Sequence, residues 1–402
     1  MFLTRVWLLL ICFLPGCLAH EPELGEPRRT EEAQPVEHVA APAERVVDST
    51  MWVPEDFPFV LYRQIVGSRE ATENVVISPV TALIEMDAIA RESEPDVARG
   101  IAERLGFSGD VAAMNAHIDG LVAELEARRL REGRFINRRG GSYEILEEDE
   151  ERLRGALRIE WLSFQRRSSG EKDRLEEQLA DRSDGFLSGK DFAIEGQREA
   201  YDLRAMLFVG QSVSQISRRS LQSGEFRRPD GEVTPIEIGH RSFSPALTVV
   251  EDGTFMELAL LGNEISLFLL LPAEDDELST LEERLTAALI EEWIEGLTSA
   301  RVHYGDLPLL DLRDFIDLSP HFEALGFEEV PGLNRRLLHP SRFVLGREGV
   351  NHPEPVRIAS SPGGMIQRRT DDTWGSFDRP FLFFLYDRPS STVLLMGRVA
   401  SP

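Results

Sequence analysis

The chain has 402 residues, 42% of them hydrophobic, and its 70 acidic against 44 basic side chains give a formal net charge of −26. This composition is that of a globular protein, and after the N-terminal segment no stretch approaches the ~20 apolar residues that span a bilayer. Because such an acidic surface repels phosphate backbones, we expect no nucleic acid among the protein's partners. The two cysteines, Cys12 and Cys17, both lie near the N-terminus, which excludes an internal disulfide or a thiolate metal site in the rest of the chain.

The first residues have the pattern of an export signal. Met1–Arg5 is a short basic start, and Val6–Leu14 is an apolar stretch of signal-core length. The run from Leu14 to Cys17 resembles a bacterial lipobox, in which the cysteine is acylated and becomes the new first residue. We expect residues 1–17 to be a signal peptide of an exported protein. Two outcomes stay open: a lipid anchor at Cys17 that holds the protein in the cell envelope, or cleavage after Ala19 that releases a secreted protein.

Residues 18–50 have the composition of a solvated tether. They contain four prolines and seven glutamates and little that could build a core. We expect this segment to be disordered and the folded domain to run from residue 51 to residue 402.

Helical patterns come first along the folded part. Phe57, Val60, Leu61, Ile65 and Val66 recur at helical spacing. Ser78-Pro79 is typical of a helix start, with serine as the cap and proline in the first turn. Two more helices are predicted, one from Asp96 to Leu105 that stops at Gly106 and one from Val111 to Leu130.

Strand patterns dominate the second half. Short apolar runs bounded by Gly, Pro, Asp or Asn are typical of buried strands, and five occur here: 205–209, 255–260, 265–271, 381–386 and 392–396. The predicted class is therefore α+β, with large sheets and with helices concentrated early in the chain.

Motifs for enzyme chemistry are thin. Residues 210–214 come closest to a nucleophile elbow around Ser212, but the closing glycine is missing. The eight histidines are scattered without metal-ligand spacing. We expect no enzymatic activity, no metal and no cofactor.

One basic cluster stands against the acidic background. Six arginines lie between Arg128 and Arg139, opposed only by Glu132. This cluster could bind a polyanion such as an acidic polysaccharide. The alternative is that it pairs with the acidic stretch Glu147–Glu151 and other nearby carboxylates.

The C-terminal segment is the most specific part of the sequence. Residues 377–385, followed by 392–399, resemble the closing strand pair of the serpins. Other stretches resemble serpin elements in the family's order, namely residues 59–64, 74–79, 104–107, 260–272 and 322–327. The resemblance covers nearly all of residues 52–402. It implies the serpin fold, with about three β-sheets, eight or nine helices concentrated in the N-terminal half, and an exposed reactive-centre loop near the C-terminus.

The resemblance also implies a mechanism and a partner. A serpin presents a loop as bait to a serine or cysteine protease, and the cut loop inserts as a new strand into the largest sheet and distorts the attached protease. The stored strain of a metastable fold is released by this insertion. The implied protein is a monomeric inhibitor, and the alternative is a non-inhibitory serpin-fold binding or scaffold protein whose loop is cleaved without trapping the protease.

A group called here the shutter, after the family, consists of Ser78, Pro79, Arg204 and His339. The resemblance implies that Ser78 caps a helix beneath the large sheet and that His339 bonds across the sheet. Arg204 stands where the family usually has asparagine, and Ser212 where it has tryptophan. The alternative for His339 is an exposed imidazole.

The loop hinge departs from the family. Glu348-Gly349-Val350 matches the family's hinge with Val350 in place of threonine, but the alanines that should follow are replaced by residues 351–355, Asn-His-Pro-Glu-Pro. Pro353 and Pro355 lack the N–H that a central strand needs. We therefore expect a cut loop to insert slowly, partially or not at all.

Two counts place the scissile bond differently. The family's interval measured back from Pro380-Phe381 gives Arg369-Thr370, with Arg368 as its neighbour, whereas a forward count from Gly349 gives Gly363-Gly364. We favour Arg369, because a trypsin-like pocket binds its side chain as an ion pair. The expected partner is a trypsin-like serine protease, or else a cysteine protease.

Overall fold

The computed structural model describes residues 54–127, 134–137, 141–144, 157–166, 177, 180–181, 201–212, 216, 220–243, 246–251, 253–260, 264–273, 278–299, 303–327, 336–351 and 376–402. Several predicted features fall outside these residues. They are Cys17, the tether of residues 18–50, the arginine side chains from Arg128 to Arg139, and the loop residues Pro353, Pro355, Gly363, Gly364, Arg368, Arg369 and Thr370.

The described part of the chain contains seven α-helices, four of them early. These are α1 (Phe57–Val66), α2 (Pro79–Glu92), α3 (Pro95–Ala102), α4 (Val111–Ala127), α7 (Leu278–Arg284), α8 (Ala287–Glu295) and α9 (Ser319–Phe322). Short turns of helix, η1 (Pro54–Asp56), η2 (Glu103–Phe107) and η4 (Glu323–Phe327), adjoin α1, α3 and α9. The early helices were predicted, and Gly106 (φ 85°) ends the helical run of α3 and η2 as expected.

One sheet has five strands in the order β13-β14-β15-β5-β4 and contains both parallel and antiparallel pairs. Its strands are β4 (Leu157–Arg166), β5 (Tyr201–Gln211), β13 (Leu310–Asp317), β14 (Arg336–Leu345) and the two-residue β15 (Gly349–Val350). At one end β5 and β14 pair directly and in parallel, 336–338 with 201–203. At the other end β15 lies between them and is antiparallel to both. The facing edges between these two ends, residues 204–209 and 339–344, are called the seam below.

The other strands form two more large sheets and a two-stranded pair. The seven-stranded sheet contains β1 (Val75–Ile77), β17 (Thr392–Val399), β16 (Phe381–Asp387), β10 (Ile265–Pro272), β9 (Gly253–Ala259), β8 (Ala246–Val250) and β11 (Thr298–Ser299). The three-stranded sheet contains β12 (His303–Pro308), β7 (Val233–Phe243) and β6 (Leu221–Arg227), and β2 (Arg134–Asn137) pairs with β3 (Gly141–Glu144). All five predicted buried strands are confirmed, as β5, β9, β10, β16 and β17.

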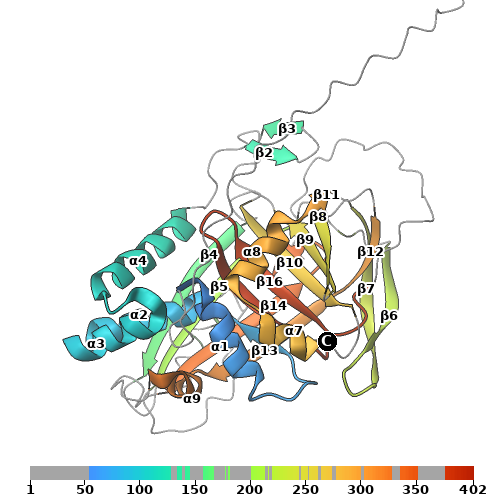
Figure 1. Ribbon diagram of the computed structural model, residues 1–402. Coiled ribbons are helices and arrows are strands. Elements are labelled where there is room, and N and C mark those ends of the chain that lie inside the picture. The colour runs from blue at the N-terminus through green and yellow to red at the C-terminus, as the bar shows by residue number, and fades with distance from the viewer. Residues whose placement is uncertain are drawn as a thin grey trace, which may run out of the picture. The chain divides into compact units, whose positions relative to one another are not determined.

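Apolar side chains hold the sheets and helices together. Phe343 of β14 stacks on Phe383 of β16, with ring centroids 3.9 Å apart and an interplanar angle of 7°, which joins the five-stranded to the seven-stranded sheet. Helix α2 packs against both β5 and β17, and α2 and β5 are labelled in Figure 1. Any change in the spacing of β5 and β14 therefore changes how α2 and the core beneath the sheet pack against these strands.

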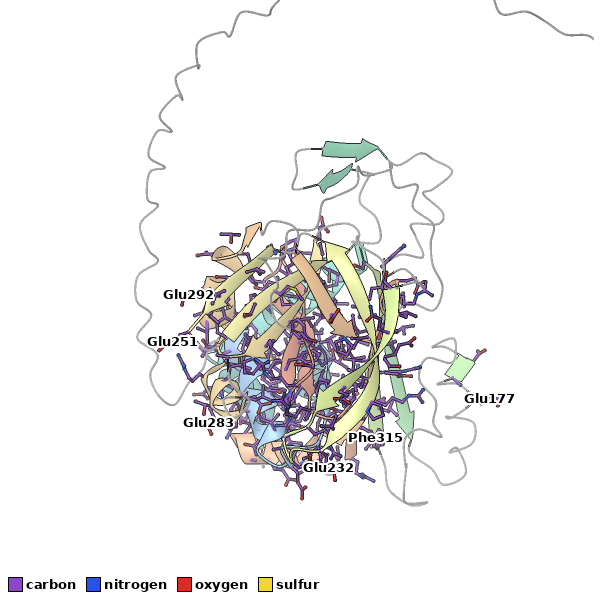
Figure 2. The ribbon with its side chains drawn as sticks, turned by 90° about the vertical axis from the view of Figure 1, so that its right-hand side faces the viewer. Glu177, Glu232, Glu251, Glu283, Glu292 and Phe315 are labelled. Carbon is purple, nitrogen blue, oxygen red and sulfur yellow. The ribbon has the colours of Figure 1, made fainter. Side chains whose placement is uncertain are left out.

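Carboxylates cover the outside of this body. The labelled Glu232, Glu251, Glu283 and Glu292 point outward from the packed interior in Figure 2, and all four are exposed. Among the described residues, no helix combines the length and the apolar character needed to cross a membrane.

Candidate functional site

The N-terminus of α2 lies at the seam because Ser78 and Pro79 fix where the helix begins. Ser78 is extended (φ −102°, ψ 98°), and its Oγ accepts from the Thr81 N–H at 3.4 Å. Pro79 occupies the first turn, where its missing N–H is not needed. This start directs the Ser78 backbone N–H away from the helix and toward β14.

His339 of β14 receives that N–H. Ser78 N–H donates to His339 Nε2 at 3.0 Å, and the side chain is 1% exposed. An accepting Nε2 carries no proton, so the imidazole is neutral with its proton on Nδ1. Burial lowers the pKa of His339 to about 4, and the nearby Arg204 backbone acts in the opposite direction. His339 thus connects β14 to α2, and the alternative of an exposed imidazole is wrong.

Arg204 of β5 makes a second connection to α2. Its Nε contacts Glu85 Oε2, and the two side chains are 20% and 4% exposed. The carboxylate lies one helical turn beyond Thr81, on the face of α2 that packs under β5. Arg204 was predicted only as a departure from the family's asparagine. The structure shows that the departure is matched by a buried carboxylate.

The hinge begins inside the sheet. Gly349 has φ 152°, and a Cβ there would lie 2.2 Å from the Gly210 carbonyl oxygen, so only glycine fits. Val350 is fully buried between Gly210 and Leu345. The Ser212 N–H donates to the Glu348 carbonyl at 2.7 Å, and the Ser212 side chain is buried, so it is no exposed nucleophile.

Asn351 follows the inserted segment, and it was not among the predicted site residues. It is 5% exposed, has φ 53°, and bonds to both sides of the seam. The signal that points to it is its type, because asparagine tolerates the left-handed region and so favours a turn directly after Val350.

The structure therefore brings the shutter residues together at one part of the seam and places Gly349 and Val350 at its other end. Pro353, Pro355 and the predicted scissile bond lie outside the described residues. Within the described residues, no three His, Cys, Asp or Glu side chains gather in a way that could hold a metal ion.

A sheet whose central strands meet at one end and are separated by a loop hinge at the other is specific enough to compare with known families. The family model described as "Serpin (serine protease inhibitor)" matches residues 53–402. The chain is a serpin. The predicted fold is thereby confirmed, and at family level serpins are protease inhibitors and not enzymes.

Curated relatives of this serpin are distant. Human antithrombin-III is 20% identical over 418 residues, which covers 96% of this chain and 89% of the relative. Neuroserpin of Mus musculus is 27% identical over 54% of this serpin and 57% of the relative. Plasminogen activator inhibitor 1 of Sus scrofa is 29% identical over 50% of this serpin and 53% of the relative.

Solved structures agree on the fold. The complex of thyroxine-binding globulin with thyroxine aligns with a TM-score of 0.68 at 13% identity, over 87% of this serpin and 98% of that chain. Native protease nexin-1 with heparin aligns with a TM-score of 0.63 at 16% identity, over 87% and 98%. At this identity the likeness establishes the fold of the described sheets.

The neutral state of His339 predicts a loss of stability in acid. In the unfolded chain the imidazole binds a proton near pH 6.5, whereas the folded value is about 4. The stabilisation that comes from the neutral His339 is therefore fully present above pH 6.5 and is lost as the pH falls to about 4. The loss amounts to roughly 3 kcal/mol. Urea unfolding at a series of pH values measures it.

His339→Gln is the matched control, because its amide oxygen can still accept from the Ser78 N–H but does not titrate. The difference in unfolding free energy between wild type and this variant should shrink by roughly 3 kcal/mol from pH 7.5 to pH 4. Parallel stability profiles for the two proteins would contradict a buried neutral His339.

Proposed function

We propose that this serpin inhibits a trypsin-like serine protease by presenting residues 352–375 as bait, with the scissile bond between Arg369 and Thr370. The observation that carries the proposal is β15, since Gly349 and Val350 already lie as a short strand between β5 and β14. A loop that starts inside the sheet can extend the same strand after cleavage. Relatives with inhibitor names, leukocyte elastase inhibitor and plasminogen activator inhibitor 1, support the same role.

The seam supports this proposal physically. An added strand needs two free edges, and β5 and β14 offer them only if their direct pairing at 336–338 and 201–203 gives way. That direct ladder is parallel and short, whereas an inserted strand would be antiparallel to both neighbours, as β15 is. Antiparallel pairing is slightly more stable per residue, so replacing the direct contact with a full added strand is favourable.

Arginine at the cut sets the expected protease class. The guanidinium of Arg369 would form a bidentate ion pair with a carboxylate at the base of a trypsin-like specificity pocket. Arg368 is the neighbouring alternative, and cleavage at Gly363-Gly364 would require a different protease class. A cysteine protease that accepts arginine would fit the same bait.

A second candidate function is that of a non-inhibitory serpin whose loop is only cleaved. The observations that favour it are the turn at Asn351 (φ 53°) and the two prolines that follow. Likeness to thyroxine-binding globulin, a serpin-fold protein that binds a small molecule, agrees with this candidate. A polyanion bound at Arg128 to Arg139, one of the two interpretations of that cluster, would suit either function.

Titration with trypsin separates the two. Inhibition predicts a complex of serpin and trypsin that survives boiling in detergent, together with a released peptide that begins at Thr370. Arg369→Gln should abolish the complex, while Arg368→Gln should keep it. Quantitative cleavage with full trypsin activity remaining would contradict trapping and support the second candidate.

A further inference from the structure

Asn351 follows the last residue of β15, and its backbone does not continue the strand. Its φ of 53° lies in the left-handed region, whereas an inserted strand needs an extended backbone at this residue. Its side chain lies in the sheet between β14 and β5 and is 5% exposed.

Both backbone groups of Val344 on β14 are satisfied by Asn351. The Asn351 N–H donates to the Val344 carbonyl at 2.8 Å, and the Val344 N–H donates to Asn351 Oδ1 at 2.6 Å. In a continued antiparallel strand the second acceptor would be the carbonyl of Asn351 itself. The side-chain oxygen has taken the place of that carbonyl.

The amide nitrogen of Asn351 likewise takes the place of a backbone group on the other side of the seam. Asn351 Nδ2 donates to the Phe208 carbonyl of β5 at 2.9 Å, and it lies 3.5 Å from the Arg342 carbonyl. The register of β15 with β5 pairs Gly349 with Gln211 and Val350 with Gly210, so residue 352 would pair with Phe208. The Nδ2 group therefore occupies the position that the N–H of the next inserted residue would take.

We propose that Asn351 is a stop for loop insertion: its planar amide imitates the next peptide group of the strand and holds the seam closed behind β15. It is a positioning residue, because it would act on the depth of insertion and not on a protease. The inference deepens the proposed inhibitory function, on which its biological role rests, since trapping requires insertion past this residue. For insertion to proceed, both side-chain bonds must break and Asn351 must become extended.

The stop is tested on the uncleaved full chain with a strand-forming probe. The probe is a fluorescein-labelled peptide of alternating threonine and alanine as long as β5, 11 residues, and its rate of stable incorporation is followed by native electrophoresis. Asn351→Gly keeps the left-handed turn available but removes the amide, so it should incorporate the peptide about tenfold faster than wild type, equivalent to ~1.4 kcal/mol. Asn351→Asp should also be faster, because its second oxygen faces the Phe208 carbonyl.

Thr286→Ala is the matched control for general destabilisation. Thr286 caps α8 through the Leu289 N–H and does not touch the seam, so its loss weakens the fold but should leave incorporation at the wild-type rate. Equal rates for wild type and Asn351→Gly would overturn the proposal. So would acceleration by Thr286→Ala as large as that by Asn351→Gly.

Amide exchange decides the matter if no variant incorporates the peptide. The Val344 amide should exchange about tenfold faster in Asn351→Gly than in wild type, and it should stay protected in Asn351→Asp, which keeps an acceptor oxygen. Unchanged exchange at Val344 in Asn351→Gly would overturn the stop. Neither readout involves a protease, so a failure to trap trypsin would leave this result unaffected.

Discussion

Replacing Arg204 with methionine should lower the free energy of unfolding by about 3 kcal/mol. The change removes the guanidinium that contacts Glu85 and leaves a carboxylate that is only 4% exposed in a region of low dielectric. Breaking a buried ion pair from one side costs about 3–5 kcal/mol, and the 20% exposure of Arg204 places the effect at the lower end. Urea unfolding at pH 7 measures it.

A double variant distinguishes the loss of the ion pair from the loss of side-chain packing at Arg204. When Arg204 and Glu85 are both replaced by methionine, neither charge of this pair is left buried without the other, and the stability should return to within ~1 kcal/mol of wild type. A double-mutant cycle should therefore give a coupling energy above ~1 kcal/mol. Additive losses would contradict a direct interaction.

An exposed pair on a neighbouring helix provides the control. Arg99 and Asp96 of α3 lie 3.3 Å apart with side chains 62% and 92% exposed. Arg99→Met should change stability by less than ~1 kcal/mol, because solvent screens exposed pairs. The contrast would show that burial beneath β5, and not the presence of an ion pair, makes the Arg204 contact important.

The helices and buried strands could be predicted because their signals are local. Ser78-Pro79 identifies a helix start by itself, and the apolar run from Phe381 to Tyr386 has the composition of a strand buried on both faces. Strands with one face in solvent carry a weaker signal: β13 alternates buried Leu310 and Leu312 with the exposed Asp311, and β6 and β7 contain many polar residues. These strands were not predicted.

The contacts of the site could not be predicted, because they join residues far apart in the sequence. Arg204 was recognised as a departure from the family, but nothing around it indicates that its partner is Glu85 on α2. Asn351 is of a residue type that is common in turns. Its role follows only from the carbonyl of Phe208, which the fold places on the opposite strand.

The same register gives the two prolines a definite consequence. The Asn351 N–H points to Val344 of β14, and N–H groups two residues apart in a strand point to the same neighbour. If the loop inserted further in this register, which pairs Val350 with Leu345, residue 353 would face Arg342 and residue 355 would face Pro340. Both prolines would therefore withhold a donor from the same strand, β14.

Cleavage after Arg369 should therefore raise the melting temperature only slightly in the unmodified chain. Two carbonyls of β14 would be left without donors, at about 1–3 kcal/mol each, and His352 and Glu354 would have to enter the interior. Replacing residues 352–355 by alanine removes both penalties and should increase the shift on cleavage by roughly 10 °C. Differential scanning calorimetry of native and trypsin-nicked protein measures both shifts.

Alanine at Asp371 and Asp372 is the control, because both residues follow the proposed scissile bond in the sequence and would not be part of the inserted strand. Their replacement should leave the shift unchanged. A nicked wild-type protein that resists boiling would contradict the prediction, since it would show that the full strand enters despite the prolines. The missing donors would then have to be supplied by a change of register or a bulge at residues 353–355, because β14 cannot bury two carbonyls without partners and remain in the centre of a sheet.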